Sequence, residues 1–184
     1  MALRSLKTAL GAAAAILLLA AAPAFAQASE QAVKAAFIPK FTRYIEFPAP
    51  AQPAAGQPYY LCVIGRDPFG PLIDRAAASE MVDGHPVAVR RFANTDPDAV
   101  AGCHIAFLAG VTDQATAAMI EALRRQPTLT VTDARSGRTR GMIHFALVDG
   151  RVRFHIDQAA AAQRGIAISS RLLALAVDVR QTAP

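Results

Sequence analysis

Hydrophobic residues along this chain follow two patterns that alternate from one segment to the next. Continuous or alternating apolar runs predict strands over residues 59–64, 86–92, 103–108 and 129–132. Helical spacing of apolar positions predicts helices over residues 69–79 and 112–125. This order of strands and helices predicts an α/β fold: a single domain with a largely parallel or mixed central sheet and helices on both faces.

Two alternating runs near the C-terminus predict a β-hairpin, because the Asp149-Gly150 pair between them is typical of a two-residue turn. Such a turn fixes the register and places His144 directly opposite His155 on one face. The opposite face is apolar and is expected on the core, with Ile143, Phe145, Leu147, Val152, Phe154 and Ile156. A helix is expected after the hairpin, with an apolar stripe over Ile168–Val179.

The N-terminal part of the predicted domain gathers aromatic residues. Residues 30–44 have helical spacing, which Pro39 interrupts because proline lacks a backbone donor. Four aromatic side chains come close together along this segment, and they are Phe37, Phe41, Tyr44 and Phe47. We expect them either in the core or at a surface that contacts a partner or a second subunit, so they form the candidate partner-binding set.

Residues 1–26 have the pattern of a secretory signal peptide. Two basic residues precede a short apolar run, and Ala24-Phe25-Ala26 fits a small-x-small cleavage site. The apolar run is short for a membrane anchor, which is the alternative interpretation. We therefore expect a periplasmic mature protein that consists of one domain, residues 27–184.

Composition and charge exclude several classes of protein. A hydrophobic fraction of 53% with 18% charged residues rules out a disordered chain. Loss of Arg4 and Lys7 with the signal peptide lowers the formal net charge from +5 to +3, which argues against a nucleic-acid partner for an exported protein. Arginines gather at residues 90–91 and 135–140. They either receive an acidic partner or lipid head groups, or they belong to solvated loops.

The two cysteines, Cys62 and Cys103, belong to two predicted buried strands. Disulfides persist in exported proteins, so we expect one here if the two strands are neighbours, with two buried thiols as the alternative. A zinc site that adds His104 is disfavoured, because adjacent residues of a strand point to opposite faces. A redox-sensing role for the disulfide is an open alternative.

His144 and His155 are the candidate metal-binding pair, since opposed strand positions bring their Cβ atoms within about 5.5 Å. The sequence places no carboxylate or third histidine visibly beside them, and a polar sheet face is the simpler interpretation. The chain contains no serine nucleophile elbow, and Gly65–Gly70 lacks the glycine patterns of dinucleotide and Walker loops. The residues therefore predict no catalytic site, no cofactor and no enzyme activity.

Several segments, taken in order, resemble the YfiR family. The similar segments are Val33–Pro48, Leu61–Gly70, Cys103–Phe107 and Gly141–Leu173. Each motif is weak alone, but the ordered set covers nearly the whole predicted domain. The chain departs from the family at Phe47, where a tryptophan is usual, and at Arg140, where a glycine is favoured.

The resemblance implies a non-enzymatic periplasmic regulator of cyclic-di-GMP signalling and biofilm formation. Members of this family repress an inner-membrane diguanylate cyclase by binding its periplasmic sensor domain. The resemblance also implies a second partner, an outer-membrane lipoprotein that sequesters the repressor, and a homodimer of the chain. From the residues alone, a periplasmic small-ligand-binding module and a metal-dependent enzyme that uses the histidine pair are the alternatives.

Overall fold

The computed structural model of the chain describes residues 22–96 and 98–181. Its α-helices are α2 (Ala22–Phe37), α3 (Pro71–Ala78), α4 (Asp113–Ala122), α5 (Gln158–Ala162) and α6 (Ser170–Leu173). Short 3-10 helices are η1 (Pro39–Tyr44), η2 (Ala49–Ala51) and η3 (Ala134–Ser136). The strands are β1 (Ile45–Glu46), β2 (Tyr59–Gly65), β3 (Met81–Val82), β4 (His85–Phe92), β5 (Ile105–Ala109), β6 (Leu129–Asp133), β7 (Ile143–Val148), β8 (Arg151–Asp157), β9 (Ala167–Ile168) and β10 (Asp178–Arg180).

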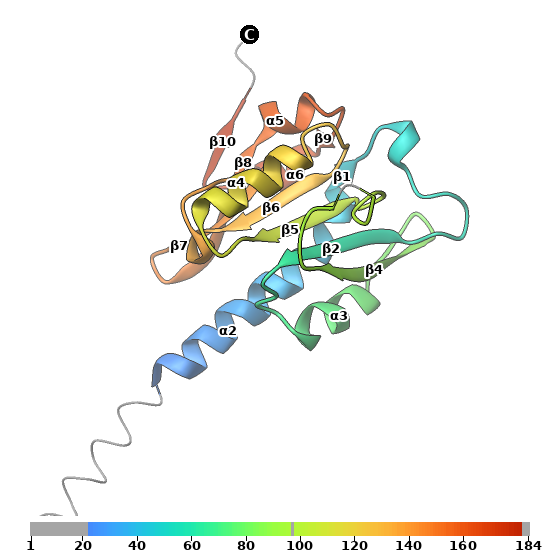
Figure 1. Cartoon of the computed structure of the whole chain (residues 1–184). Coiled ribbons are helices and arrows are strands. Elements are labelled where there is room, and N and C mark those ends of the chain that lie inside the picture. Colours follow the sequence, from blue (N-terminus) through green and yellow to red (C-terminus); the bar gives the residue numbers. More distant parts are fainter. Residues whose placement is uncertain (1–21, 97, 182–184) are drawn as a thin grey trace, which may run out of the picture.

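One mixed sheet organises the part of the chain that the structure describes (Figure 1). Its eight strands follow the order β10-β8-β7-β6-β5-β2-β4-β3, and the central strands from β4 to β7 run parallel. β8 is antiparallel to β7, and β3 is antiparallel to β4. The predicted single α/β domain with a largely parallel, mixed sheet is confirmed.

Both faces of the sheet are apolar, and each is covered by helices as predicted. On one face, Val63 and Phe107 belong to a core that also includes Phe41 of η1, with α2, α3, α5 and α6 on the same side. On the opposite face, Ile64 packs in a smaller core with Leu123, which directly follows α4. Figure 1 shows α4 on one side of the sheet and α2 with α3 on the other. Side chains from both faces of β2, β5 and β6 are buried, which explains the continuous apolar runs in the sequence.

The predicted hairpin and its register are confirmed. His144 faces His155, and Phe145 faces Phe154, across β7 and β8. Asp149 has a φ of 50° and Gly150 a φ of 70°, as a two-residue turn with both residues in the left-handed region requires. Leu147, at the turn end of the apolar face, is 48% exposed. The core therefore covers only the part of this face that lies away from the turn.

A second hairpin joins β3 and β4. It is not predicted from the sequence, because the apolar run at β3 is too short to indicate a strand. Its turn is Asp83-Gly84, with φ values of 51° and 81°. Val82 faces His85 across this turn. The Asp-Gly pair is the same signal that identifies the C-terminal hairpin, so the sequence does contain the information.

A helix follows the hairpin as predicted, but it is much shorter than the apolar stripe over Ile168–Val179. Ile168 belongs to β9, which pairs with β1, while α6 is a single turn whose N-cap is Ser169. Residues 178–180 form β10, which pairs in parallel with β8 at the edge of the sheet. Apolar residues three or four positions apart fit both a helix and this turn-then-strand arrangement. The open main-chain groups of β8 decide the outcome, because β10 satisfies them.

The N-terminal helix ends where the sequence predicts an interruption. α2 ends at Phe37 and Pro39 begins η1, which confirms the predicted interruption at Pro39. Residues 1–21, most of the predicted signal peptide, lie outside the described residues. Within the described ranges, no helix combines the length and the apolar character needed to cross a membrane.

Candidate functional site

The disulfide connects two neighbouring strands. Cys62 of β2 is bonded to Cys103, which lies just before β5, and their Cα atoms are 5.8 Å apart. β2 and β5 pair in parallel, and His104 Nδ1 accepts a hydrogen bond from the Tyr60 amide at 2.9 Å. The bond leaves no thiolate for the zinc site weighed from the sequence, since both sulfur atoms are used.

A polar row crosses four strands at His144 and His155. Pairing in register places Thr132 of β6, His144 of β7, His155 of β8 and Asp178 of β10 side by side. His144 is 3% exposed, and its Nδ1 lies 2.8 Å from the Thr132 hydroxyl, which itself accepts from the amide of Gly141. A hydroxyl has one donor and two acceptor positions, so Thr132 can pair with Nδ1 of His144 in either neutral tautomer while it accepts from Gly141.

Burial also keeps this ring neutral. It lowers the pKa of His144 to about 4, and the neighbouring Arg140 guanidinium acts in the same direction. A cleft of about 290 Å³ lies beside the two histidines and includes Arg140 and Arg180 in its wall. In the described ranges, no cluster of three metal-ligating side chains is arranged to hold an ion. His144 is thus held by hydrogen bonding in a sheet face beside an open cleft, whereas Nδ1 of His155 is buried without a hydrogen-bond partner among the described residues.

A buried charge cluster, which sequence reasoning misses, fixes α2 to the sheet. Lys34 is fully buried, and its Nζ donates to Asp133 Oδ2 at 2.7 Å and to Glu30 one helical turn earlier. Arg135 of η3 donates to the second oxygen of Glu30 at 2.8 Å. The partners lie far apart in the sequence, so no local pattern announces the cluster. Its role is to set the position of α2, because a buried ammonium is stable only beside its carboxylates.

The aromatic set is split between core and surface. Phe41 is 1% exposed and Phe47 is 2% exposed, so the core alternative holds for these two and they are not available to a partner. Apolar periodicity leaves both alternatives open, since it identifies a helix face and not its depth. Phe37 is 37% exposed, and Tyr44 is half-buried against the core. Only these two remain candidates for partner contact.

Phe37 belongs to an exposed apolar area that we call the Phe154 patch: Val33, Phe37, Leu147 and Val177 around Phe154. The Phe37 and Phe154 rings meet edge to face, with centroids 6.3 Å apart. The Val177 amide donates to the Phe154 carbonyl at 2.9 Å, and Leu147 lies on the same face of the hairpin. Each of the four surrounding side chains is exposed by more than a third. Exposed apolar side chains gathered in one area are typical of a protein-contact surface.

The predicted arginine groups are mostly engaged within the chain. Arg91 pairs with Asp67 at 2.8 Å and with Asp74 at 2.6 Å. Arg90 lies over the Tyr60 ring at 4.8 Å from its centroid. Arg135 belongs to the buried charge cluster, so Arg138 and Arg140 are the members of these groups that stay open candidates for an acidic partner or lipid head groups.

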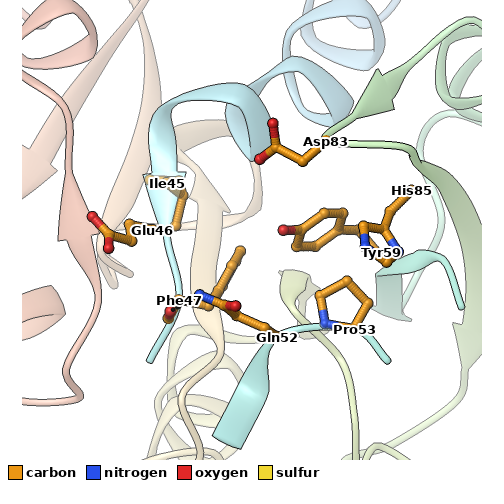
Figure 2. A pocket seen from close by; sticks show the side chains of 8 residues that line it. All are labelled: Ile45, Glu46, Phe47, Gln52, Pro53, Tyr59, Asp83 and His85. Atoms are coloured by element: carbon orange, nitrogen blue, oxygen red, sulfur yellow. Dashed lines mark hydrogen bonds between the residues drawn. The ribbon is translucent and has the colours of Figure 1, made fainter. Parts of the chain in front are cut away.

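A second concave site lies at the end of the sheet opposite the β7–β8 turn (Figure 2). We call it the Tyr59 cleft. It has a volume of about 200 Å³. Its lining residues are Ile45, Glu46, Phe47, Gln52, Pro53, Tyr59, Asp83 and His85. The segment between β1 and β2 forms one wall, and the β3–β4 turn forms another. Figure 2 shows the Tyr59 hydroxyl pointing into the space between these walls.

Aromatic contacts hold the floor of this cleft. Tyr59 meets the His104 ring with centroids 5.0 Å apart and the Phe47 ring at 5.9 Å. His85 packs edge to face on Tyr59, and its Nδ1 lies 2.7 Å from the Gln57 carbonyl. Burial, together with the Asp83 carboxylate, raises the pKa of the Tyr59 hydroxyl. The floor is therefore a neutral phenol beside a carboxylate.

The sequence is similar to that of a known protein family. The profile of one protein family, DUF4154, described as YfiR/HmsC-like, matches residues 31–177. The chain belongs to the YfiR/HmsC-like family. This match confirms the resemblance seen in the sequence motifs, and it extends from α2 to the start of β10. The family is associated with the regulation of diguanylate cyclases, and its members are generally regulatory rather than catalytic.

Other comparisons add little. No curated protein matches the chain. Among solved structures, the chain is similar to a conserved domain protein from Vibrio cholerae O1 biovar El Tor strain N16961, with 16% sequence identity and a TM-score of 0.45. The match covers 66% of this chain and 54% of that chain, so it spans about half of the Vibrio protein.

Proposed function

We propose that this YfiR/HmsC-like protein is a non-enzymatic periplasmic regulator. In this proposal, the mature chain of residues 27–184 binds the periplasmic sensor domain of an inner-membrane diguanylate cyclase and holds cyclic-di-GMP synthesis down. The observation that carries the proposal is the family match over residues 31–177. An outer-membrane lipoprotein that competes for the regulator, and a homodimer of the chain, belong to the same proposal.

The Phe154 patch is the surface that we assign to the sensor domain. Its exposed side chains come from α2, from the hairpin and from the segment before β10, so they form a surface rather than a linear motif. Burial of such apolar area supplies affinity, with about 25 cal/mol for each Å² removed from water. Aromatic anchors such as Phe37 are enriched among the residues that dominate binding energy.

Repression follows from a difference in affinity between two states of the sensor domain. A regulator that binds the inactive state more tightly shifts the cyclase toward that state, and only by the ratio of the two affinities. Typical couplings of about 1–3 kcal/mol change the active population roughly 5- to 150-fold. No chemistry on the regulator itself is needed.

The test is a crosslinking pull-down of the tagged protein from the producing cell, read by mass spectrometry, with cyclic-di-GMP measured in parallel. We expect recovery of a membrane protein with a cytoplasmic cyclase domain, and higher cyclic-di-GMP when the gene is deleted. A sound preparation that captures no such protein would overturn the proposal.

Substitutions in the patch make the test specific. Leu147→Asp and Val33→Asp place a charge in the Phe154 patch at side chains that are 48% and 38% exposed. Val111→Asp is the matched control, because Val111 is 78% exposed and lies in the loop before α4, outside the patch. The first two variants should lose the partner and raise cyclic-di-GMP, while the control should behave as the unsubstituted protein does. Thermal unfolding of all three checks that they fold.

A further inference from the structure

The Tyr59 cleft has a hydrogen-bonding group that the fold itself does not use. Tyr59 is 8% exposed, and no described residue forms a hydrogen bond with its hydroxyl, which points into the cleft (Figure 2). The hydroxyl oxygen is open to the cleft rather than enclosed in the core. A phenol that the fold leaves free at the base of an open cleft can form a hydrogen bond with a polar group from outside the chain.

The charged groups of the cleft are acceptors, and the side-chain amide of Gln52 donates to the Phe47 carbonyl at 3.3 Å. Asp83 is exposed on the β3–β4 turn, and Figure 2 shows its carboxylate above the Tyr59 hydroxyl. Among the described residues, no lysine or arginine forms an ion pair with Asp83, in contrast to Asp67 and Asp74. The cleft lining also contains no lysine or arginine. A ligand for this site must bring donors and positive charge.

The histidine in the wall agrees with this character. The Gln57 carbonyl can only accept, so Nδ1 of His85 donates to it and this proton is not available to a ligand. Glu46 adds a negative charge at the rim, although Figure 2 shows its carboxylate turned away from the space above Tyr59. The chain as a whole carries a formal net charge of +5, so this acidic cleft stands apart from the balance of the molecule.

Size and shape narrow the class of ligand. The volume of about 200 Å³ lies below the roughly 300–1,000 Å³ that is typical of sites for whole small molecules. A single side chain is the better match. The rings of Phe47, Tyr59 and His85 line the space, and a guanidinium group is flat, stacks on aromatic rings and offers five donors.

We propose that the Tyr59 cleft binds the side chain of an arginine on the protein partner, with the guanidinium between the Asp83 carboxylate and the Tyr59 hydroxyl. The proposal rests on the proposed function in that the arginine belongs to the sensor domain. The cleft then supplies specificity, while the Phe154 patch supplies apolar contact, because charged groups determine which partner is accepted more than how tightly it is held.

The first experiment needs no cyclase. Nα-acetyl-arginine amide is titrated into the ¹⁵N-labelled protein that lacks the predicted signal peptide, and amide shifts are followed by NMR. We expect saturable shift changes that centre on Gln52, Tyr59, Asp83 and His85. The citrulline analogue has the same shape without the charge, and it should bind up to about fivefold more weakly, as the loss of one exposed ion pair implies.

Two substitutions test the named groups. Asp83→Asn removes the charge and keeps the turn, because asparagine tolerates the φ of 51° at this position. Tyr59→Phe removes only the hydroxyl. Each should weaken binding of the arginine probe by about fivefold. Asp149→Asn is the matched control, since Asp149 has a φ of 50° in the other Asp-Gly turn and lies outside the cleft.

The outcomes separate this proposal from the proposed function. Equal binding of the citrulline analogue, unchanged binding by Asp83→Asn, or an absence of saturable shifts would overturn the arginine site. Binding of the probe together with a pull-down that captures no cyclase would support the cleft and refute the proposed function. Loss of the probe by Asp83→Asn with full recovery of the cyclase would show that the cleft lies outside that interface, which also overturns the proposal.

Discussion

The Cys62–Cys103 disulfide closes a loop with a sequence separation of 41, which contains α3, β3 and β4. In the chain-entropy description, a cross-link stabilises the fold by removing conformations from the unfolded state. For a loop of this length, that entropy corresponds to about 4 kcal/mol at 25 °C. Opening the bond should therefore lower the free energy of unfolding by about 4 kcal/mol.

This loss is large compared with the stability of an ordinary domain. Free energies of unfolding are roughly 5–15 kcal/mol, so reduction should remove a quarter or more of the total. For a chain of this size, each kcal/mol shifts the melting temperature by about 2–4 °C, which gives a fall of about 8–16 °C. The reduced protein should still fold at 25 °C, with little margin at higher temperature.

Urea unfolding of the oxidised protein, with and without a phosphine reductant, measures the effect. The double variant Cys62→Ala/Cys103→Ala should be as unstable as the reduced protein or somewhat more so, because Cys62 is fully buried and Cys103 is 4% exposed. The reductant should not change the double variant further, which serves as the control. A loss below about 1 kcal/mol in fully reduced protein, with two free thiols counted, would refute the entropic reasoning.

Three further predictions concern single residues. Lys34→Met leaves two buried carboxylates without their ammonium and should cost about 3–5 kcal/mol in urea unfolding, and a loss below about 1 kcal/mol would contradict the buried cluster. Burial lowers the pKa of His144 to about 4 in the folded protein. Since this pKa lies below the unfolded value, its neutral ring stabilises the fold above about pH 6.5, and up to about 3 kcal/mol is lost as the pH falls toward 4. His144→Gln should show a smaller loss between pH 7 and 4.5, and equal losses would refute this. Gly65→Ala brings a Cβ to 2.4 Å from the Ala109 carbonyl, whereas Gly150→Ala meets nothing within 4 Å at a similar φ. Gly65→Ala should therefore lower the melting temperature far more than its control, which should cost about 1 kcal/mol.

Short-range patterns predict most of the sheet, because its elements depend on neighbours along the chain. The pairing of His144 with His155 follows from one Asp-Gly turn and from the alternation on either side of it. Thr112 directly precedes α4 and caps it, since its hydroxyl accepts from the Ala115 amide at 3.1 Å. The C-terminal strand β10 escapes such reasoning, since it forms only because β8 offers an open edge.

The candidate sites depend more on long-range contacts, and the sequence predicts them less well. Phe41 and Phe37 carry the same helical signal, yet one is buried and the other is exposed, because burial depends on which strands lie opposite. The Tyr59 cleft joins residues of three separate segments, and no spacing in the chain links Tyr59 to Asp83. Among the sites, only the disulfide can be predicted from composition, because an exported chain with two cysteines favours a bond between them.

The attachment of α2 has a consequence for how the chain folds. Lys34 meets Asp133 across 99 positions, and Arg135 meets Glu30 across 105. Folding rates fall as contacts connect more distant parts of a sequence, since long loops must close before those contacts form. α2 can pack on η1 and α3 early, because both come soon after it in the sequence. Its buried charge cluster is complete only after β6 and η3 have joined the sheet, so the final position of α2 depends on the second half of the domain.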